Sequence, residues 1–344
     1  MTYRRFTITI IAMTVLLVVL ALACLVFGSV DIPVDKITDI LTGKGSGNKA
    51  WDIIILQSRI PMIITAALAG AALSISGLLL QTTFNNPLAG PSILGVSSGA
   101  GLGVAIVILA LGGSLGGILG ENVGSYIAVL VGALLGAGAV LIILIAFSAI
   151  VRSNTMLLII GILVSYLTSS VVQLLNSVAT EEGVHNYVAW GFGNFSGVSA
   201  AQMPIYAGII ILALIGSALM VKPLNALLLG TRYARNLGIN VSRTRNILLL
   251  ITGILTAVVT AFCGPIGFIG LVVPHIARMS LGTSNHTRLV PATILAGAVI
   301  ALLCCLTSVC NPHGIIPINA ITPIIGVPII LYIILNRRRI QYFN

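Results

Sequence analysis

Charged residues are scarce in this chain: they make up only 7% of its 344 residues, whereas 58% are apolar. Soluble domains carry about 25% charged residues, so this composition excludes a soluble protein. It also excludes intrinsic disorder, which needs low hydrophobicity and high net charge. Only seven residues are acidic, against 17 Lys and Arg. We expect this positive excess to reflect membrane topology, and not the binding of nucleic acid.

Motifs for catalysis and for metal binding are missing as well. No G-x-x-x-x-G-K-[ST] phosphate loop occurs, so the chain is not expected to hydrolyse ATP by that route. The five Cys lie in or beside apolar stretches and are interpreted as buried thiols. The four His are scattered, without the spacing of metal ligands. We therefore predict no catalytic residue, no metal site and no cofactor in this chain.

Long apolar runs are what the sequence has in abundance. A membrane-spanning helix takes about 20 apolar residues, whereas an outer-membrane barrel would alternate apolar and polar residues. The unbroken runs predict an all-α polytopic membrane protein with ten transmembrane helices in a single transmembrane domain over residues 1–344. The ten predicted spans lie at residues 6–30, 60–80, 91–111, 123–151, 156–178, 203–221, 247–263, 266–280, 289–309 and 318–335.

The distribution of charge predicts which ends of the spans face the cytoplasm. With the N-terminus inside, 13 of the 17 basic residues fall in cytoplasmic segments, and all seven acidic residues fall outside. The positive-inside rule therefore favours ten spans with both termini cytoplasmic. The cytoplasmic cations include Arg152 and Arg337–Arg339, and five more lie in residues 222–245, the longest cytoplasmic connection.

No Asp or Glu lies within any predicted span. Proton- and sodium-coupled carriers usually keep such groups in the membrane for the coupling ion, so their absence argues against an ion-coupled secondary carrier. Sodium sites made of backbone carbonyls stay possible. A membrane-anchored electron-transfer subunit would place paired His on facing helices, and the sequence has no such pair. The energy for any transport is therefore expected to come from another component, at the cytoplasmic face of the membrane.

Ten spans divide into five plus five, and an odd number per half gives the inverted-repeat arrangement of many transporters. Span 3 starts with Gly90–Gly95 and span 8 with Gly264–Gly270, each with a Pro that we place in the first helical turn. Short, Pro-interrupted helices are tolerated where they line a cavity or pack inside protein. These Pro residues are consistent with a re-entrant segment that lines a pathway and equally with a simple kink in a spanning helix.

Small residues suggest where helices approach one another closely. The chain contains 37 Gly, and several of them recur at G-x-x-x-G spacing, which lets two helix backbones come near each other. We interpret these pairs as packing positions and not as a ligand site. They are Gly99/Gly103, Gly112/Gly116 and Gly132/Gly136.

Three stretches carry a family resemblance. They are Arg59–Pro61 with Ala69–Gly77, Gln81 and Asn85–Ala100, then Gly230–Asn240, and finally Gly264–Arg278. The combination of N-P-L-A-x-P-x-x-L-G with G-F-x-G-L-x-x-P-H-x-x-R closely resembles the FecCD family, and the motifs occur in the family's order. Members of this family are permease subunits of bacterial ABC importers for ferric siderophores, haem and cobalamin.

The resemblance implies a permease subunit of an ATP-driven importer in the bacterial inner membrane. Its cargo would be an iron complex of the siderophore or haem type, with cobalamin as the alternative. The implied partners are a second permease subunit, two ATP-binding cassette ATPases that bind ATP and Mg, and an extracytoplasmic substrate-binding protein. The length of one permease, instead of a double-length fusion, favours two identical copies.

The resemblance also assigns residues 222–245 to coupling with the ATPase. By its own pattern this stretch forms two short helices separated by Gly230, the second with Gly238 as its C-cap. Such helices can dock in a partner's groove, or stay a solvated loop on lipid headgroups. The residues expected to contact the ATPase are Leu229, Gly230, Arg232, Ala234, Arg235, Leu237 and Gly238.

Arg59 is the residue expected to receive the binding protein on the outer side. In the resembled family an R-x-P-R pattern there supplies two cations, whereas here Met62 replaces the second one. Arg59 therefore carries the pattern alone, unless it is only a snorkelling interfacial side chain.

Polar residues at the inner ends of spans 2–3 and 4–5 resemble the place where the family's pathway closes at the cytoplasmic side. Ser, Asn and Thr are also favoured helix caps, so gate and cap are both open interpretations. The predicted gate residues are Asn85, Asn86, Leu88, Asn154 and Thr155.

Overall fold

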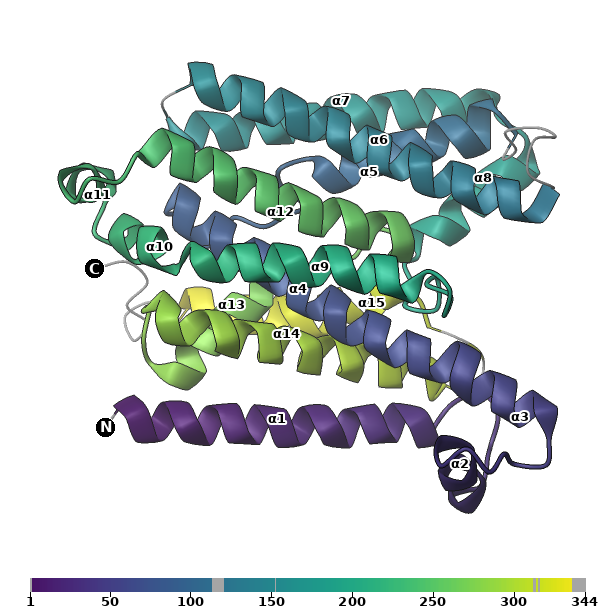
Figure 1. Ribbon diagram of the computed structural model, residues 1–344. Coiled ribbons are helices and arrows are strands. Elements are labelled where there is room, and N and C mark those ends of the chain that lie inside the picture. The colour runs from purple at the N-terminus through teal and green to yellow at the C-terminus, as the bar shows by residue number, and fades with distance from the viewer. Residues whose placement is uncertain (1, 113–120, 152, 312–313, 315, 336–344) are drawn as a thin grey trace.

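The computed structural model describes residues 2–112, 121–151, 153–311, 314 and 316–335, and every regular element in these residues is a helix (Figure 1). Arg152 and Arg337–Arg339, which support the predicted topology, lie outside the described residues, as does Gly116. The helices are α1 (Thr2–Val26), α2 (Val34–Leu41), α3 (Lys49–Ile53), η1 (Ile54–Arg59), α4 (Ile60–Phe84), α5 (Val96–Ala105), η2 (Ile106–Ala110), α6 (Glu121–Ile150), α7 (Asn154–Val178), α8 (Glu181–Gly191), α9 (Met203–Leu219), α10 (Val221–Leu228), α11 (Thr231–Asn236), α12 (Val241–Cys263), α13 (Ile269–Leu281), α14 (His286–Val309) and α15 (Ile318–Leu335).

Six helices in the described residues are long and apolar enough to cross a membrane: α1, α6, α7, α12, α14 and the continuous helix from α3 through η1 to α4. Helices α9 and α10 pass the same test together, with a bend of 50° between them, which raises the number to seven. Three shorter apolar helices, α5 with η2, α13 and α15, occupy the remaining predicted spans. The chain is therefore a multi-pass helical membrane protein, while the count of ten spans and the inverted repeat stay predictions.

The two ends of the bundle differ in charge. In Figure 1 the start of α1 lies at the same end as α10 and α11, whereas α2, α3 and α8 lie at the opposite end. The first end exposes basic residues and the second carries acidic ones, as the predicted topology requires. The exposed cations at the first end include Arg4, Arg5, Lys222, Arg232 and Arg235, and the acidic residues of α2 and α8 are Asp35, Asp39, Glu181 and Glu182.

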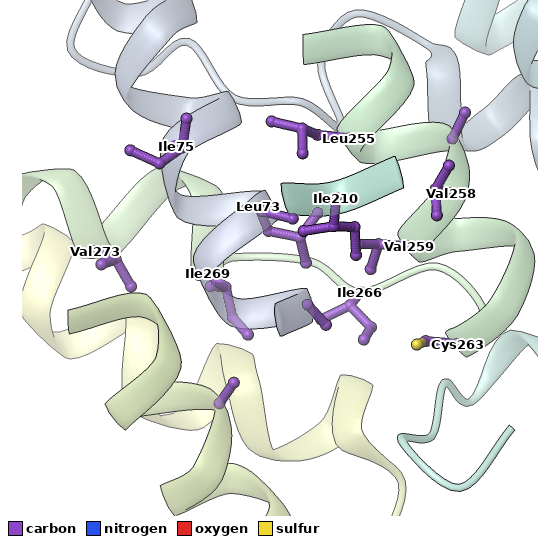
Figure 2. Close-up of a cluster of buried hydrophobic side chains, with 14 of the residues drawn as sticks. Leu73, Ile75, Ile210, Leu255, Val258, Val259, Cys263, Ile266, Ile269 and Val273 are labelled. Carbon is purple, nitrogen blue, oxygen red and sulfur yellow. The ribbon is translucent and has the colours of Figure 1, made fainter. Parts of the chain in front are cut away.

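Helix α4 runs diagonally through the centre of the bundle, and every residue from Ala69 to Phe84 is buried (Figure 1). Figure 2 shows Leu73 of α4 within an apolar cluster that includes Ile210 of α9 and Val259 of α12. Ile266, from the segment that precedes α13, lies in the same cluster. The core of the protein is therefore built around α4.

Two non-helical segments replace the expected helical starts of spans 3 and 8. Residues 85–95 separate α4 from α5, and residues 264–268 separate α12 from α13. The predicted placement of Pro91 and Pro265 in a first helical turn is wrong. Gly95 (φ 79°) and Phe268 (φ 65°) follow them in left-handed conformations, and a right-handed helix begins only after such residues.

The predicted close packing of two G-x-x-x-G pairs is confirmed, because Gly99 and Gly103 of α5 face Gly132 and Gly136 of α6. A Cβ atom on Gly103 would lie 1.9 Å from the carbonyl oxygen of Gly132. A Cβ atom on Gly136 would lie 2.1 Å from the carbonyl oxygen of Gly99. Both distances are far below van der Waals contact, so only glycine permits this approach of α5 and α6.

The outer end of α1 is closed by Arg59, which is only 4% exposed. Its Nη1 donates to the carbonyl oxygens of Leu25 (2.6 Å) and Val26 (2.9 Å), and its Nη2 donates to the Val30 carbonyl. Gly28 makes room, since a Cβ atom there would lie 2.9 Å from Nη2. Arg59 is therefore not an exposed cation: its guanidinium satisfies carbonyls at the end of α1 and in the segment that follows, while its role in docking the binding protein stays a prediction.

Replacing Gly136 by Ala should destabilise the protein by about 1–3 kcal/mol, as overpacking of a tight contact does. Gly138 lies on the same helix with no atom within 4 Å of an added Cβ, so it is the matched control. Gly138→Ala should be neutral or slightly stabilising, because Ala is the better helix former by up to about 1 kcal/mol. Thermal unfolding in detergent compares the two, and equal melting temperatures would contradict the α5–α6 packing.

Replacing Arg59 by Ala should also lower the melting temperature, because each buried carbonyl left without a donor costs about 1–3 kcal/mol. Arg59→Lys should recover only part of the loss, since one ammonium cannot match the guanidinium fork. Lys49→Ala removes an exposed cation from the same continuous helix and serves as the control. If the unfolding of Arg59→Ala resembled that of Lys49→Ala, the structural role of Arg59 would be disproved.

Candidate functional site

Helices α10 and α11 form the predicted pair of short helices. Gly230 lies between them with φ 94°, and α11 ends at a complete Schellman motif. In this motif the N–H of Gly238 donates to the Arg235 carbonyl (2.9 Å), and the N–H of Ile239 donates to the Ala234 carbonyl (3.0 Å). Gly238 has φ 81°, so the predicted glycine C-cap is confirmed.

Three large apolar side chains of this helical pair, which we call its apolar stripe, are exposed to solvent. Leu229, Tyr233 and Leu237 are spaced four residues apart and are 56%, 67% and 63% exposed. Arg232 and Arg235 are exposed beside them. Tyr233 was not among the predicted contacts. It lies on α11, whereas Leu229 precedes Gly230 and Leu237 follows the last turn, so a single helical periodicity does not reveal all three.

Ala234 behaves differently from the other residues predicted to contact the ATPase. It is fully buried, on the side of α11 that packs against the rest of the protein. Gly230 and Gly238 set the backbone turns, and a Cβ atom on either would meet no atom within 4 Å. The accessible surface of the pair therefore includes its apolar stripe and the cations Lys222, Arg232 and Arg235.

Asn85 ends α4 in a left-handed conformation with φ 48°. Its N–H donates to the Thr82 carbonyl (3.3 Å), and the N–H of Asn86 donates to the Gln81 carbonyl (3.1 Å). The Asn86 Oδ1 then accepts from the N–H of Leu88 (2.9 Å). Asn85 and Asn86 thus turn the chain out of α4, which is the capping interpretation of these residues.

Asn154 lies on α7 and connects two other helices. Its Nδ2 donates to the Thr83 carbonyl at the end of α4 (2.8 Å), and its Oδ1 accepts from Nη1 of Arg245 on α12 (3.3 Å). Ser153, and not Asn154, is the N-cap of α7, because its hydroxyl accepts from the N–H of Met156 (3.4 Å). The side chain of Asn154 is therefore free to bridge α4 and α12.

An open pocket of about 610 Å³ is lined by some of the predicted ATPase-coupling residues and some of the predicted gate residues. Asn85 and Asn154 line one side of it, and residues 227–231 and Tyr233 line the other. Leu229 and Gly230 of the predicted coupling element thus face Asn85 and Asn154 of the predicted gate. The remaining predicted residues do not line this pocket: Arg232, Ala234, Arg235, Leu237, Gly238, Asn86, Leu88 and Thr155.

The sequence motifs that carry the family resemblance also meet in space. Gln81 accepts from Nη1 of Arg278 at its Oε1 (2.5 Å), and its Nε2 donates to the Leu271 carbonyl (3.1 Å). Nε2 of His275 lies 2.8 Å from the carbonyl oxygen of Pro87. The N-P-L-A segment and the P-H-x-x-R helix are therefore joined at the end of α4.

Comparisons with known proteins agree with this arrangement. The FecCD transport family matches residues 16–336. The chain is 34% identical to the vitamin B12 import system permease protein BtuC of Citrobacter koseri, over 84% of each chain. It is 32% identical to the molybdate import system permease protein MolB of Haemophilus influenzae, over 95% of each chain.

A solved structure described as an inward-facing conformation of a metal-chelate type ABC transporter is also similar. It superimposes with a TM-score of 0.82 at 30% sequence identity, and the match covers 96% of this chain and 98% of the other. The family match spans nearly the whole chain, and the fold and the relatives agree with it. The chain therefore belongs to the FecCD transport family, whose members named here are ABC importer permeases.

Proposed function

We propose that this chain is the permease subunit of an ATP-driven importer in the bacterial inner membrane. It works as a dimer of two identical permeases with two ATP-binding cassette ATPases and an extracytoplasmic substrate-binding protein. The observation that carries the proposal is the exposed apolar stripe of Leu229, Tyr233 and Leu237, at the end of the bundle predicted to be cytoplasmic.

The chemistry of this stripe suits a protein partner. Three large apolar side chains in water are unfavourable unless a groove covers them, and short helices with exposed apolar side chains are common ligands for such a groove. Arg232 and Arg235 flank the stripe and favour a partner with acidic residues at the rim of its groove. Leu229 and Tyr233 also line the open pocket between the helical pair and the end of α4. This space lets the pair move relative to α4 when the partner changes shape.

The cargo we propose is an iron complex of the siderophore or haem type. Its support is the similar structure described as a metal-chelate type transporter, because siderophores and haem are iron chelates. The vitamin B12 permease relative supports cobalamin as the second candidate. The molybdate permease relative shows that similar chains are assigned different cargoes, so the cargo needs a direct test.

Reconstitution tests the function and the cargo together. The permease is purified with the ATP-binding subunit that copurifies with it and placed in liposomes with its binding protein. We expect uptake of a ferric siderophore or haemin that requires ATP, and no ATPase activity from the permease alone. ATP-driven uptake of cyanocobalamin or molybdate instead would replace the proposed cargo. Accumulation driven by an ion gradient without any ATPase would overturn the importer itself.

Gly238→Val tests the docking surface through its backbone. A side chain in the left-handed region costs roughly 1–2 kcal/mol, and more for a β-branched one, so the turn should distort and ATPase binding should weaken about tenfold. Gly238→Asn is the control, because Asn tolerates this conformation. Copurification yield and ATP hydrolysis rate are the measurements. Equal values for the Val variant, the Asn variant and the wild type would show that this turn does not shape the docking surface.

A further inference from the structure

The first of two buried connections links α10 to the last turn of α4 through His286. The Oδ1 of Asn225 on α10 accepts from the backbone N–H of His286 (2.8 Å) and lies 3.1 Å from its Nδ1. On the other side of the ring, Nε2 lies 2.8 Å from the hydroxyl of Thr82. His286 is fully buried and Asn225 is half-buried, so solvent has little access to these contacts.

The partners of His286 determine its tautomer. The amide oxygen of Asn225 can only accept, so the ring donates from Nδ1. A neutral ring then accepts at Nε2 from the Thr82 hydroxyl, for which the Leu78 carbonyl (3.0 Å) is the alternative acceptor. Asn225 also donates from Nδ2 to Oδ1 of Asn285 (3.1 Å), which fixes the orientation of its amide. The Asn225 amide and the His286 ring therefore have a defined orientation, and the single Thr82 hydroxyl proton goes either to Nε2 or to the Leu78 carbonyl.

The second connection starts on α12, the helix that follows α11 in the chain and contacts it. Arg245 is 8% exposed and donates from Nη1 to Asn154, which in turn donates to the Thr83 carbonyl. Its Nη2 donates to the carbonyls of Ser148 and, at 3.0 Å, Val151, where α6 ends. Asn154 is thus held between a buried guanidinium and the end of α4.

The two connections converge on neighbouring residues, Thr82 and Thr83, which only Phe84 separates from the left-handed Asn85. We infer that the contacts Asn225–His286–Thr82 and Arg245–Asn154–Thr83 act as paired positioning relays. They transmit displacement of α10 and α11 to the last turn of α4 and to the segment that follows it. This inference rests on the proposed ATP-driven function, because the displacement is the one that a bound ATPase would impose.

The far side of the relay is connected as well. Gln81 precedes Thr82 and accepts a hydrogen bond from Arg278 on α13. Pro87 lies in the segment after α4, and its carbonyl contacts His275, which is also on α13. A shift of the last turn of α4 therefore changes the register of residues 85–91 against α13. Leu88 lies in this segment and is 40% exposed, so a reporter can be attached there.

The test uses the complex of the permease with its copurifying ATP-binding subunit in nanodiscs. Leu88→Cys is introduced together with Cys310→Ser, because Cys310 is the exposed one among the five thiols. The rate at which a maleimide modifies position 88 is measured without nucleotide and with ATP and vanadate. The relay variants are Thr82→Val and Asn154→Ala, each alone and combined.

Thr83→Val is the matched control for Thr82→Val. Its hydroxyl donates only within its own helix, to the Leu79 carbonyl (2.7 Å), and its main-chain carbonyl remains for Asn154. We expect ATPase binding to persist in all variants and Thr83→Val to behave like the wild type. In Thr82→Val and Asn154→Ala the nucleotide-dependent change in modification rate should fall by about 2- to 30-fold, the range known for residues along coupling networks. Thr82→Ser, which keeps the hydroxyl, should restore it.

The outcomes separate the relay from the proposed function. An unchanged nucleotide response in both relay variants, or no response at position 88 in the wild type, would overturn the relay while ATPase binding upholds the function. Failure of any ATP-binding subunit to bind the wild type would overturn the function and the relay with it. If the Thr83→Val response fell as far as that of Thr82→Val, general damage to the α4 terminus would explain both, and the relay would be rejected.

Discussion

The close approach of α4 to α13 and α14 is the constraint on which the rest of the structure depends. A Cβ atom on Gly77 would lie 1.6 Å from the Gly270 carbonyl, and one on Gly70 would lie 2.1 Å from the Gly297 carbonyl. Between helices in lipid no hydrophobic driving force remains, so association rests on such dense contact and on hydrogen bonds. Because the backbones nearly touch, the short side chains at the end of α4 can reach α13 and α14.

This packing also explains how non-helical backbone is tolerated deep in the protein. Peptide groups without helical partners are costly in an apolar medium unless protein groups satisfy them. For the segment before α13, Asn319 does so: its Oδ1 accepts from the N–H of Gly267 (3.1 Å), and its Nδ2 donates to the carbonyls of Gly191 (2.9 Å) and Pro265. For the segment after α4, the His275 ring meets the Pro87 carbonyl. The breaks in the helices are thus covered from neighbouring elements.

The features that the sequence predicted correctly are local ones. Apolar length predicted the helical membrane fold, and the left-handed preference of glycine predicted the turns at Gly230 and Gly238. The features that it missed depend on partners distant in the chain. Arg59 has the pattern of an exposed cation, yet its acceptors lie 29 to 34 positions away. His286 meets a threonine 204 positions away, and nothing in either neighbourhood announces this contact.

The turns of the helical pair and its buried contacts to α4 differ in how easily they deform, which bears on how a displacement of the pair reaches α4. Gly230 and Gly238 are exposed and lack close neighbours, so the turns around them deform at low cost. His286 and Arg245 are buried and hydrogen-bonded to neighbouring helices, where a broken hydrogen bond is less readily replaced by water and costs more. A displacement at the surface then bends the turns first and reaches α4 only when the buried contacts hold. In the relay that we propose, burial sets the order of transmission: the compliant glycines adapt to the ATPase first, and the buried contacts carry what remains of the motion to the end of α4.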